Sequence, residues 1–237
     1  MNTHKVKSLL MGGQACVLYG AAEFSRDTDL VVPAGAENMK RLSEALAELQ
    51  GECIAVPPFD PVYLEMGLAV HFRCQHPDAL NVRVDVMSKL RGVDNFSTLW
   101  DRRTTIEIGD ETIEMLSLPD LVQAKKTQRD KDWPMIARLL EANYFANRSN
   151  PTEEQITFWL RELRTASLLI EVAAHYSDEC KQETSGRELL LHAVAANEPA
   201  LEKALKEEEE KHREADRRYW QPLKDELQRL RRERNTE

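Results

Sequence analysis

The stretch MGGQACVLYGAAEFSRDTDLVV, residues 11–32, decides the fold that we expect for this chain. A glycine pair, Gly12 and Gly13, is followed by a spacer and then by two aspartates separated by one residue, Asp27 and Asp29. The apolar run 30–32 after the aspartates predicts a strand that enters a core. Because alternate side chains of a strand point to the same face, we expect Asp27 and Asp29 to project together.

Two carboxylates held this close repel each other unless a cation neutralises them. A hard divalent ion such as Mg²⁺, which prefers oxygen ligands, is the simplest partner for the pair. The glycines allow the backbone to approach a ligand closely and to present N–H groups to phosphate oxygens. Alone, a glycine pair is commonly a turn, and an Asp-x-Asp pair commonly lies in a solvated loop. Their combination predicts a metal-dependent phosphoryl-transfer site.

Met11-Gly12-Gly13 and Asp27-Thr28-Asp29-Leu30 resemble the signature of the nucleotidyltransferase superfamily typified by DNA polymerase beta. That signature joins an apolar residue and Gly-Gly or Gly-Ser to Asp-x-Asp/Glu through a spacer of about this length. The residue between the two acids is usually apolar in the family, and here it is Thr28. The resemblance implies that Asp27 and Asp29 bind two Mg²⁺ ions and that Gly12 and Gly13 cradle the triphosphate of an NTP.

The family pattern also requires a third carboxylate on a later strand, and Asp85 is the best candidate. Valines alternate with polar residues around it, which predicts a strand that carries Arg83 and Asp85 on one face. The resemblance implies that Asp85 binds the metal ion nearer the acceptor and assists the deprotonation of the acceptor. The alternative is an acid on the wet face of an edge strand. Asp60 and Asp78 are other candidates, but both lie beside prolines in expected loops.

Residues 117–132 resemble a segment that follows the catalytic sheet in bacterial nucleotidyltransferases related to abortive-infection toxins. That segment has the form Lys-x3-Arg-x2-Asp on a helix, and Lys125, Arg129 and Asp132 match it. One helical turn would separate Lys125 from Arg129, so we expect these two cations to bind the nucleotide triphosphate. The alternative is a solvated basic patch paired with the neighbouring aspartates.

Length and composition agree with a globular protein. The chain has 237 residues, of which 42% are hydrophobic and 31% charged, with a net charge of −9. This charge argues against broad affinity for nucleic acid, although a local basic groove could still receive an RNA end. No apolar run approaches the roughly 20 residues that cross a bilayer, and the first residues do not form a secretory signal. We therefore expect no membrane contact and a cytoplasmic location, which also suits the scattered cysteines.

The expected architecture is α+β. Residues 1–150 should form a nucleotidyltransferase-like catalytic domain in which a mixed β-sheet is flanked by helices, and residues 151–237 should form a helical C-terminal domain. The expected elements of the first domain are a helix over 37–50, a proline-rich loop over 57–61, strands over 68–74 and 82–87, and a hairpin over 106–115 with its turn at Gly109-Asp110.

The C-terminal domain is expected to be a bundle packed on the catalytic domain or on another subunit. Its last helix should be interrupted at Pro222, because proline removes a helical hydrogen bond. Beyond that proline, Leu223, Leu227 and Leu230 form a narrow apolar stripe. The stripe is either a minor packing contact or a surface for a protein partner or self-association.

The leading hypothesis is a Mg²⁺-dependent nucleotidyltransferase that transfers a nucleoside monophosphate from an NTP to an acceptor hydroxyl. The acceptor could be RNA, a protein or a small molecule, and the toxin-like segment favours RNA or protein in a toxin–antitoxin setting. One alternative is a nucleotidyltransferase-like protein that has lost activity and serves as a binding or scaffold module. Another is an antibiotic nucleotidyltransferase, in which Glu162, Glu171 or Asp178 could face a cationic substrate.

Overall fold

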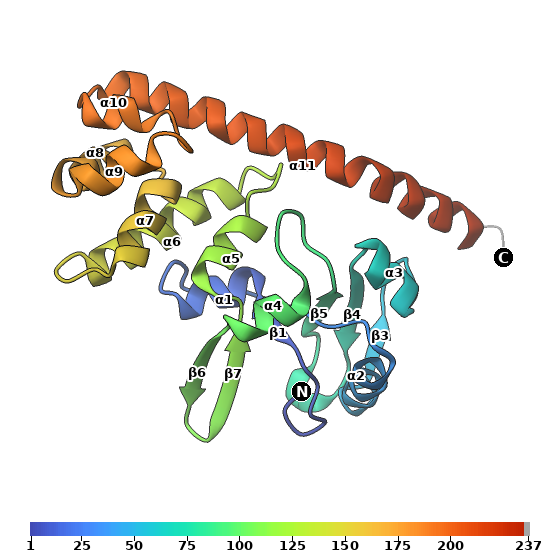
Figure 1. Cartoon of the computed structure of the whole chain (residues 1–237). Helices are drawn as coiled ribbons and strands as arrows, with labels where there is room; N and C mark the ends of the chain where they lie inside the picture. The colour runs from blue at the N-terminus through green and yellow to red at the C-terminus, as the bar shows by residue number, and fades with distance from the viewer. Residues whose placement is uncertain (235–237) are drawn as a thin grey trace. The chain divides into compact units, whose positions relative to one another are not determined.

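The computed structural model describes residues 1–234 and has the α+β class expected from the sequence. Within these residues, seven strands form one mixed sheet in the order β3-β4-β5-β2-β1-β7-β6 (Figure 1). The strands are β1 (Leu9–Met11), β2 (Asp27–Val31), β3 (Gly51–Cys53), β4 (Val70–Cys74), β5 (Arg83–Met87), β6 (Thr104–Ile108) and β7 (Glu111–Met115).

Helices separate some of these strands and follow the last of them. In the first half of the chain they are α1 (Gly12–Leu18), α2 (Ala36–Glu48), α3 (Pro61–Met66), the 3-10 helix η1 (Pro77–Ala79), α4 (Phe96–Asp101) and α5 (Leu118–Ala124). In the second half they are α6 (Asp132–Asn147), α7 (Glu153–Glu162), α8 (Ala166–His175), α9 (Ser177–Glu183), α10 (Leu190–Val194) and α11 (Glu198–Arg234).

Contacts within the described chain divide it into two compact units. Unit 1 contains residues 1–18, 22–124 and the described residues from 218 onward, and unit 2 contains residues 19–21 and 125–217. This division differs from the domain boundary that the change in composition places at residue 150. The physical reason is that α6 packs with the helices after it: the Tyr144 and Trp159 rings meet edge to face at 5.0 Å.

The centre of the sheet in unit 1 is formed by β5, β2 and β1. Strand β2 pairs with β1 in antiparallel fashion and with β5 in parallel fashion. The apolar residues that follow the aspartates in β2 are buried, as are Leu9 in β1 and Val84 and Val86 in β5. The apolar ends of these strands therefore form the core, and the polar beginning of β2 remains at its margin.

Several expected elements are present with small shifts in their ends. The helix expected over 37–50 is α2, the two expected strands are β4 and β5, and the expected hairpin is β6–β7 with Gly109 at a positive φ of 61°. Figure 1 shows this hairpin extending away from the other strands of the sheet.

Among the elements that the sequence did not predict, two are explained by their contacts. The first is β3, a three-residue strand without an apolar pattern that is formed by pairing with β4. The second is α3, which begins at Pro61 inside the expected loop. Proline is favoured in the first turn of a helix, and the Asp60 side chain caps α3 by accepting a hydrogen bond of 2.9 Å from the Val62 N–H.

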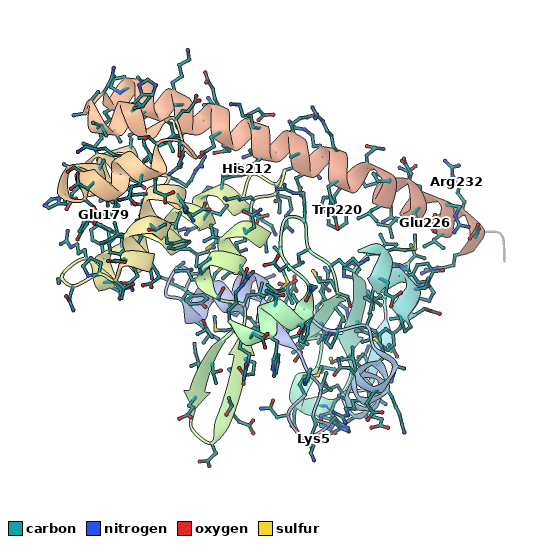
Figure 2. The ribbon with its side chains drawn as sticks, viewed as in Figure 1. Lys5, Glu179, His212, Trp220, Glu226 and Arg232 are labelled. Atoms are coloured by element: carbon teal, nitrogen blue, oxygen red, sulfur yellow. The ribbon has the colours of Figure 1, made fainter. Side chains whose placement is uncertain are left out.

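Unit 2 is an all-helical unit with its own core, as expected for the C-terminal part of the chain. Helix α7 begins with a capping box in which Thr152 and Gln155 exchange side-chain and backbone hydrogen bonds. Trp159 is fully buried, and its Nε1 donates to Asn143 Oδ1 at 2.8 Å. The ring of His212, labelled in Figure 2, lies 6.0 Å from that of Trp133, measured between centroids.

The expectation that Pro222 interrupts the last helix is wrong, because α11 continues from Glu198 to Arg234 with Pro222 inside it. The leucine stripe is partly covered within unit 1. Leu223 and Leu230 are buried, and Leu223 lies beside Gly67 at the end of α3. Among residues 1–234, no helix combines the length and the apolar character required to cross a membrane.

Candidate active site

Asp27 and Asp29 lie at the beginning of β2, as the sequence predicts. Both are partly exposed, whereas Leu30 and Val31 after them are buried. The two aspartates alternate with Thr28 and therefore lie on one face of the sheet. Thr28 faces the other way, where its hydroxyl oxygen accepts a hydrogen bond of 3.0 Å from the Gln14 side chain. The Thr28 side chain thus links β2 to α1 through a hydrogen bond.

Asp85 lies beside this pair. In the parallel pairing of β2 with β5, Asp29 is aligned with Asp85 and Asp27 is aligned with Arg83. Aligned residues on neighbouring strands share a face, so the three predicted carboxylates and Arg83 belong to one surface of the sheet. Asp85 is the most deeply placed of the three, with 8% of the residue exposed.

The glycine pair lies at the start of α1, directly after β1, and packs against the same surface. Gly12 has a φ of 68°, which favours glycine. A Cβ at Gly12 would lie 2.5 Å from Asp29 Cγ and 2.8 Å from Asp29 Cβ, and a Cβ at Gly13 would lie 2.9 Å from Ser25 Cβ. The glycines therefore give Asp29 and Ser25 the space they occupy. Their expected contact with a triphosphate stays a prediction.

The carboxylate of Asp85 is held by two side chains that the sequence analysis did not connect to it as partners. Its Oδ1 lies 2.8 Å from Arg83 Nε and 2.8 Å from His71 Nδ1. His71 is directly opposite Asp85 in the antiparallel pairing of β4 with β5. Burial raises the pKa of Asp85, but the hydrogen bonds from His71 and Arg83 outweigh burial and hold the pKa below its ordinary value.

The chemistry of this surface suits a hard cation, since carboxylate oxygens from neighbouring strands are the ligands that Mg²⁺ prefers. The side chains are not gathered into a finished cluster, however. Across residues 1–234, no group of three or more His, Cys, Asp and Glu side chains is placed to hold a metal ion. Asp85 Oδ1 is instead bonded to Arg83 and His71.

Lys125 and Arg129 were expected on one helix, and this placement is wrong. Helix α5 ends at Ala124, and the next helix begins at Asp132. Both cations instead contact the buried Asp132: Lys125 Nζ lies 3.7 Å from its Oδ1, and Arg129 Nε lies 2.7 Å from its Oδ2. Pairing with a neighbouring aspartate is the alternative that the sequence left open. A role for Lys125 and Arg129 in nucleotide binding stays a prediction.

The other acids considered from sequence have local partners or solvent. Asp60 caps α3, and the carboxylate of Asp78 is exposed. In unit 2, Glu162 pairs with Lys126 at 2.8 Å, and the exposed Asp178 pairs with Lys181 at 2.9 Å.

No family model matches the chain, and no curated protein sequence matches it. Among solved structures, the chain is similar to the crystal structure of an antigenic nucleotidyltransferase-like protein from Paracoccidioides brasiliensis. The identity is 18%, and the match covers 86% of this chain and 86% of that chain. The TM-score is 0.39, which is too low for this likeness to carry an argument. The fold class therefore depends on the strands and helices described above.

Proposed function

We propose that this protein is a divalent-metal-dependent nucleotidyltransferase. The observation that supports this proposal most directly is the parallel pairing of β2 with β5, which aligns Asp29 with Asp85 and leaves Asp27 on the same face. The glycine turn between β1 and α1 packs against this face at Asp29. Paired acids beside a glycine turn are also the motif on which the sequence resemblance rests.

In the proposed reaction, an acceptor hydroxyl oxygen forms a bond to the α-phosphorus of an NTP, and the bond from that phosphorus to the bridging oxygen breaks. Pyrophosphate leaves, and the hydroxyl proton is released to solvent. Asp27, Asp29 and Asp85 would hold two Mg²⁺ ions, which when bound neutralise the charge of the phosphates and stabilise the attacking and leaving oxygens. Gly12 and Gly13 would approach the triphosphate through backbone N–H groups.

Asp85 would bind the metal ion nearer the acceptor, as the resemblance implies, and assist the loss of the acceptor's hydroxyl proton. For Lys125 and Arg129, the resemblance supports binding of phosphate oxygens, which would require them to exchange Asp132 for phosphate.

The acceptor is proposed as RNA or a protein, in keeping with the toxin-like segment 117–132, and a small molecule such as an antibiotic is the alternative. The test is incubation of the full chain with each α-labelled NTP, Mg²⁺ and a cell extract. Labelled acceptors are separated by class and identified by their mass shift. Asp27→Ala and Asp29→Ala are expected to lose about 10²- to 10³-fold in labelling rate, whereas Asp78→Ala, which removes an exposed carboxylate, should match the parent.

The second candidate function is an inactive nucleotidyltransferase-like binding or scaffold protein. It is favoured by one observation, the engagement of Asp85 by Arg83 and His71. NTP and Mg²⁺ binding without any labelled acceptor would support this candidate. A parent protein that binds neither NTP nor metal would contradict the enzymatic proposal.

A further inference from the structure

Asp85 already has a cationic partner in the structure. Arg83 lies two residues before it on β5, so both side chains project from the same face. Arg83 Nε donates to Asp85 Oδ1 at 2.8 Å, and this hydrogen bond raises the pKa of the arginine. An arginine side chain is charged at every physiological pH. In this structure, Arg83 and Asp85 therefore form an ion pair on the proposed metal surface.

The depth of Asp85 makes a compensating positive charge necessary. Only 11% of its side chain is exposed, against 35% of that of Arg83. A carboxylate this buried is costly when ionised unless a cation or hydrogen-bond donors stand beside it. A divalent ion that uses Asp85 would supply the same compensation. The guanidinium and the ion would then compete for one carboxylate.

His71 can form a hydrogen bond with Asp85 or with Arg83. Its Nδ1 lies 2.8 Å from Asp85 Oδ1 and 3.1 Å from a terminal nitrogen of Arg83. In the tautomer with a hydrogen on Nδ1, the ring donates to Asp85. In the other tautomer, Nδ1 accepts from Arg83. The ring therefore has a hydrogen bond available whichever partner remains beside it.

We propose that Arg83 is a positioning residue that exchanges between Asp85 and the triphosphate of the NTP. Without ligand it neutralises Asp85 and opposes metal uptake. With Asp85 engaged by a divalent ion, the guanidinium would be released and, as a planar fork that matches phosphate oxygens, would contact the nucleotide. This inference rests on the proposed function, because it takes Asp85 as a metal ligand. It predicts opposite effects on the two ligands when the charge of Arg83 is removed.

The experiment measures Mn²⁺ binding and nucleotide binding separately on the full chain. Mn²⁺ is titrated in the absence of nucleotide, and the free ion is followed by electron paramagnetic resonance. Uncleavable analogues of the four NTPs, with a methylene bridge between the α- and β-phosphorus atoms, are then titrated at saturating Mn²⁺. The variants are Arg83→Gln and Arg83→Met, and circular dichroism checks that each is folded.

Arg73→Gln is the matched control. Arg73 is opposite Arg83 in the pairing of β4 with β5, so its loss removes the same charge from the same face of the sheet. Arg73 is exposed, and the ion-pair partners of Asp85 are Arg83 and His71, so Arg73→Gln leaves both of these contacts in place. The comparison separates direct competition at Asp85 from the general effect of one positive charge fewer.

Both Arg83 variants are expected to bind Mn²⁺ at least tenfold more tightly than the parent and the NTP analogue at least tenfold more weakly, since each change involves one charged hydrogen bond. Arg73→Gln should stay within about threefold of the parent for both ligands. Unchanged or weaker Mn²⁺ binding by the Arg83 variants would overturn the inference, as would unchanged binding of the analogue. If neither the parent nor the Arg83 variants bind Mn²⁺, both the proposed metal site and this inference are wrong. If the parent binds Mn²⁺ but the Arg83 variants do not change the two affinities in opposite directions, this inference is wrong and the proposed function is not affected.

Discussion

Replacement of Gly12 by alanine should destabilise the protein far more than the same replacement at another glycine with a similar backbone. Gly12 has a φ of 68°, and Gly109 in the β6–β7 turn has a φ of 61°. A Cβ at Gly109 would meet nothing within 4 Å, whereas a Cβ at Gly12 would lie 2.8 Å from Asp29 Cβ. Rotation of the Asp29 side chain cannot move that Cβ, so the backbones of β2 and α1 must separate.

The cost can be divided into two parts. The left-handed backbone costs an alanine about 1–2 kcal/mol at either position. The enforced separation at Gly12 adds about 1–3 kcal/mol, the usual range for overpacking. Gly12→Ala should therefore lose about 2–5 kcal/mol of unfolding free energy, and Gly109→Ala about 1–2 kcal/mol.

Urea denaturation of the parent and both alanine variants under one set of conditions measures the difference. In an Asp29→Gly background, the extra cost of Gly12→Ala should disappear, because all the atoms that obstruct the new Cβ are gone. Equal losses for Gly12→Ala and Gly109→Ala would refute the reasoning that Gly12 is required by its approach to Asp29.

The remaining predictions concern unit 2. Glu208 receives hydrogen bonds from the largely buried side chains of Arg164 and Arg187. Glu208→Gln should therefore cost about 3–5 kcal/mol of unfolding free energy by removing the negative charge that both guanidiniums contact, as thermal unfolding at pH 7 would show. Burial raises the pKa of Glu208, but its bonds to Arg187 and Arg164 outweigh burial and hold the pKa below the ordinary value near 4.5. The stability that ionised Glu208 contributes is therefore fully present above pH 4.5 and should be lost as the pH falls through the lower pKa of the folded state. The free energies of unfolding of the parent and of Glu208→Gln are compared over this pH range. An equally steep loss in both proteins would contradict the prediction. Thr152→Ala should cost about 1 kcal/mol by removing the hydrogen bond to the Gln155 N–H, while Thr152→Ser should keep most of it.

The sequence predicted the elements whose pattern is local. Asp27 and Asp29 are followed by an apolar run, and alternating valines surround Asp85, so β2 and β5 were found with nearly correct ends. It could not show that these two strands are neighbours, because register is decided by pairing across the sheet. The same limit hid the position of His71, whose contact with Asp85 depends on the β4–β5 register.

The two errors of helix placement have a similar cause. Lys125 and Arg129 have helical spacing, but their pairing with Asp132 replaces the expected turn of helix between α5 and α6. Pro222 should break an isolated helix, yet α11 continues through it. The buried Leu223, which follows the proline directly, keeps the chain packed there. In both places, side-chain contacts override the preference that spacing or residue type predicts.

Asp29 and Asp85 are aligned in the sheet, although α2, β3, α3 and β4 all lie between them along the chain. Any ligand that needs both carboxylates consequently recognises only molecules in which this distant pair of strands has already joined. In a chain in which β2 and β5 are not paired, such a ligand could contact only one of the two carboxylates at a time and would bind more weakly. Binding would therefore stabilise the state in which the two strands are paired. A ligand present at a hundred times its dissociation constant would lower the free energy of that state by about 2.7 kcal/mol relative to the state with the strands apart.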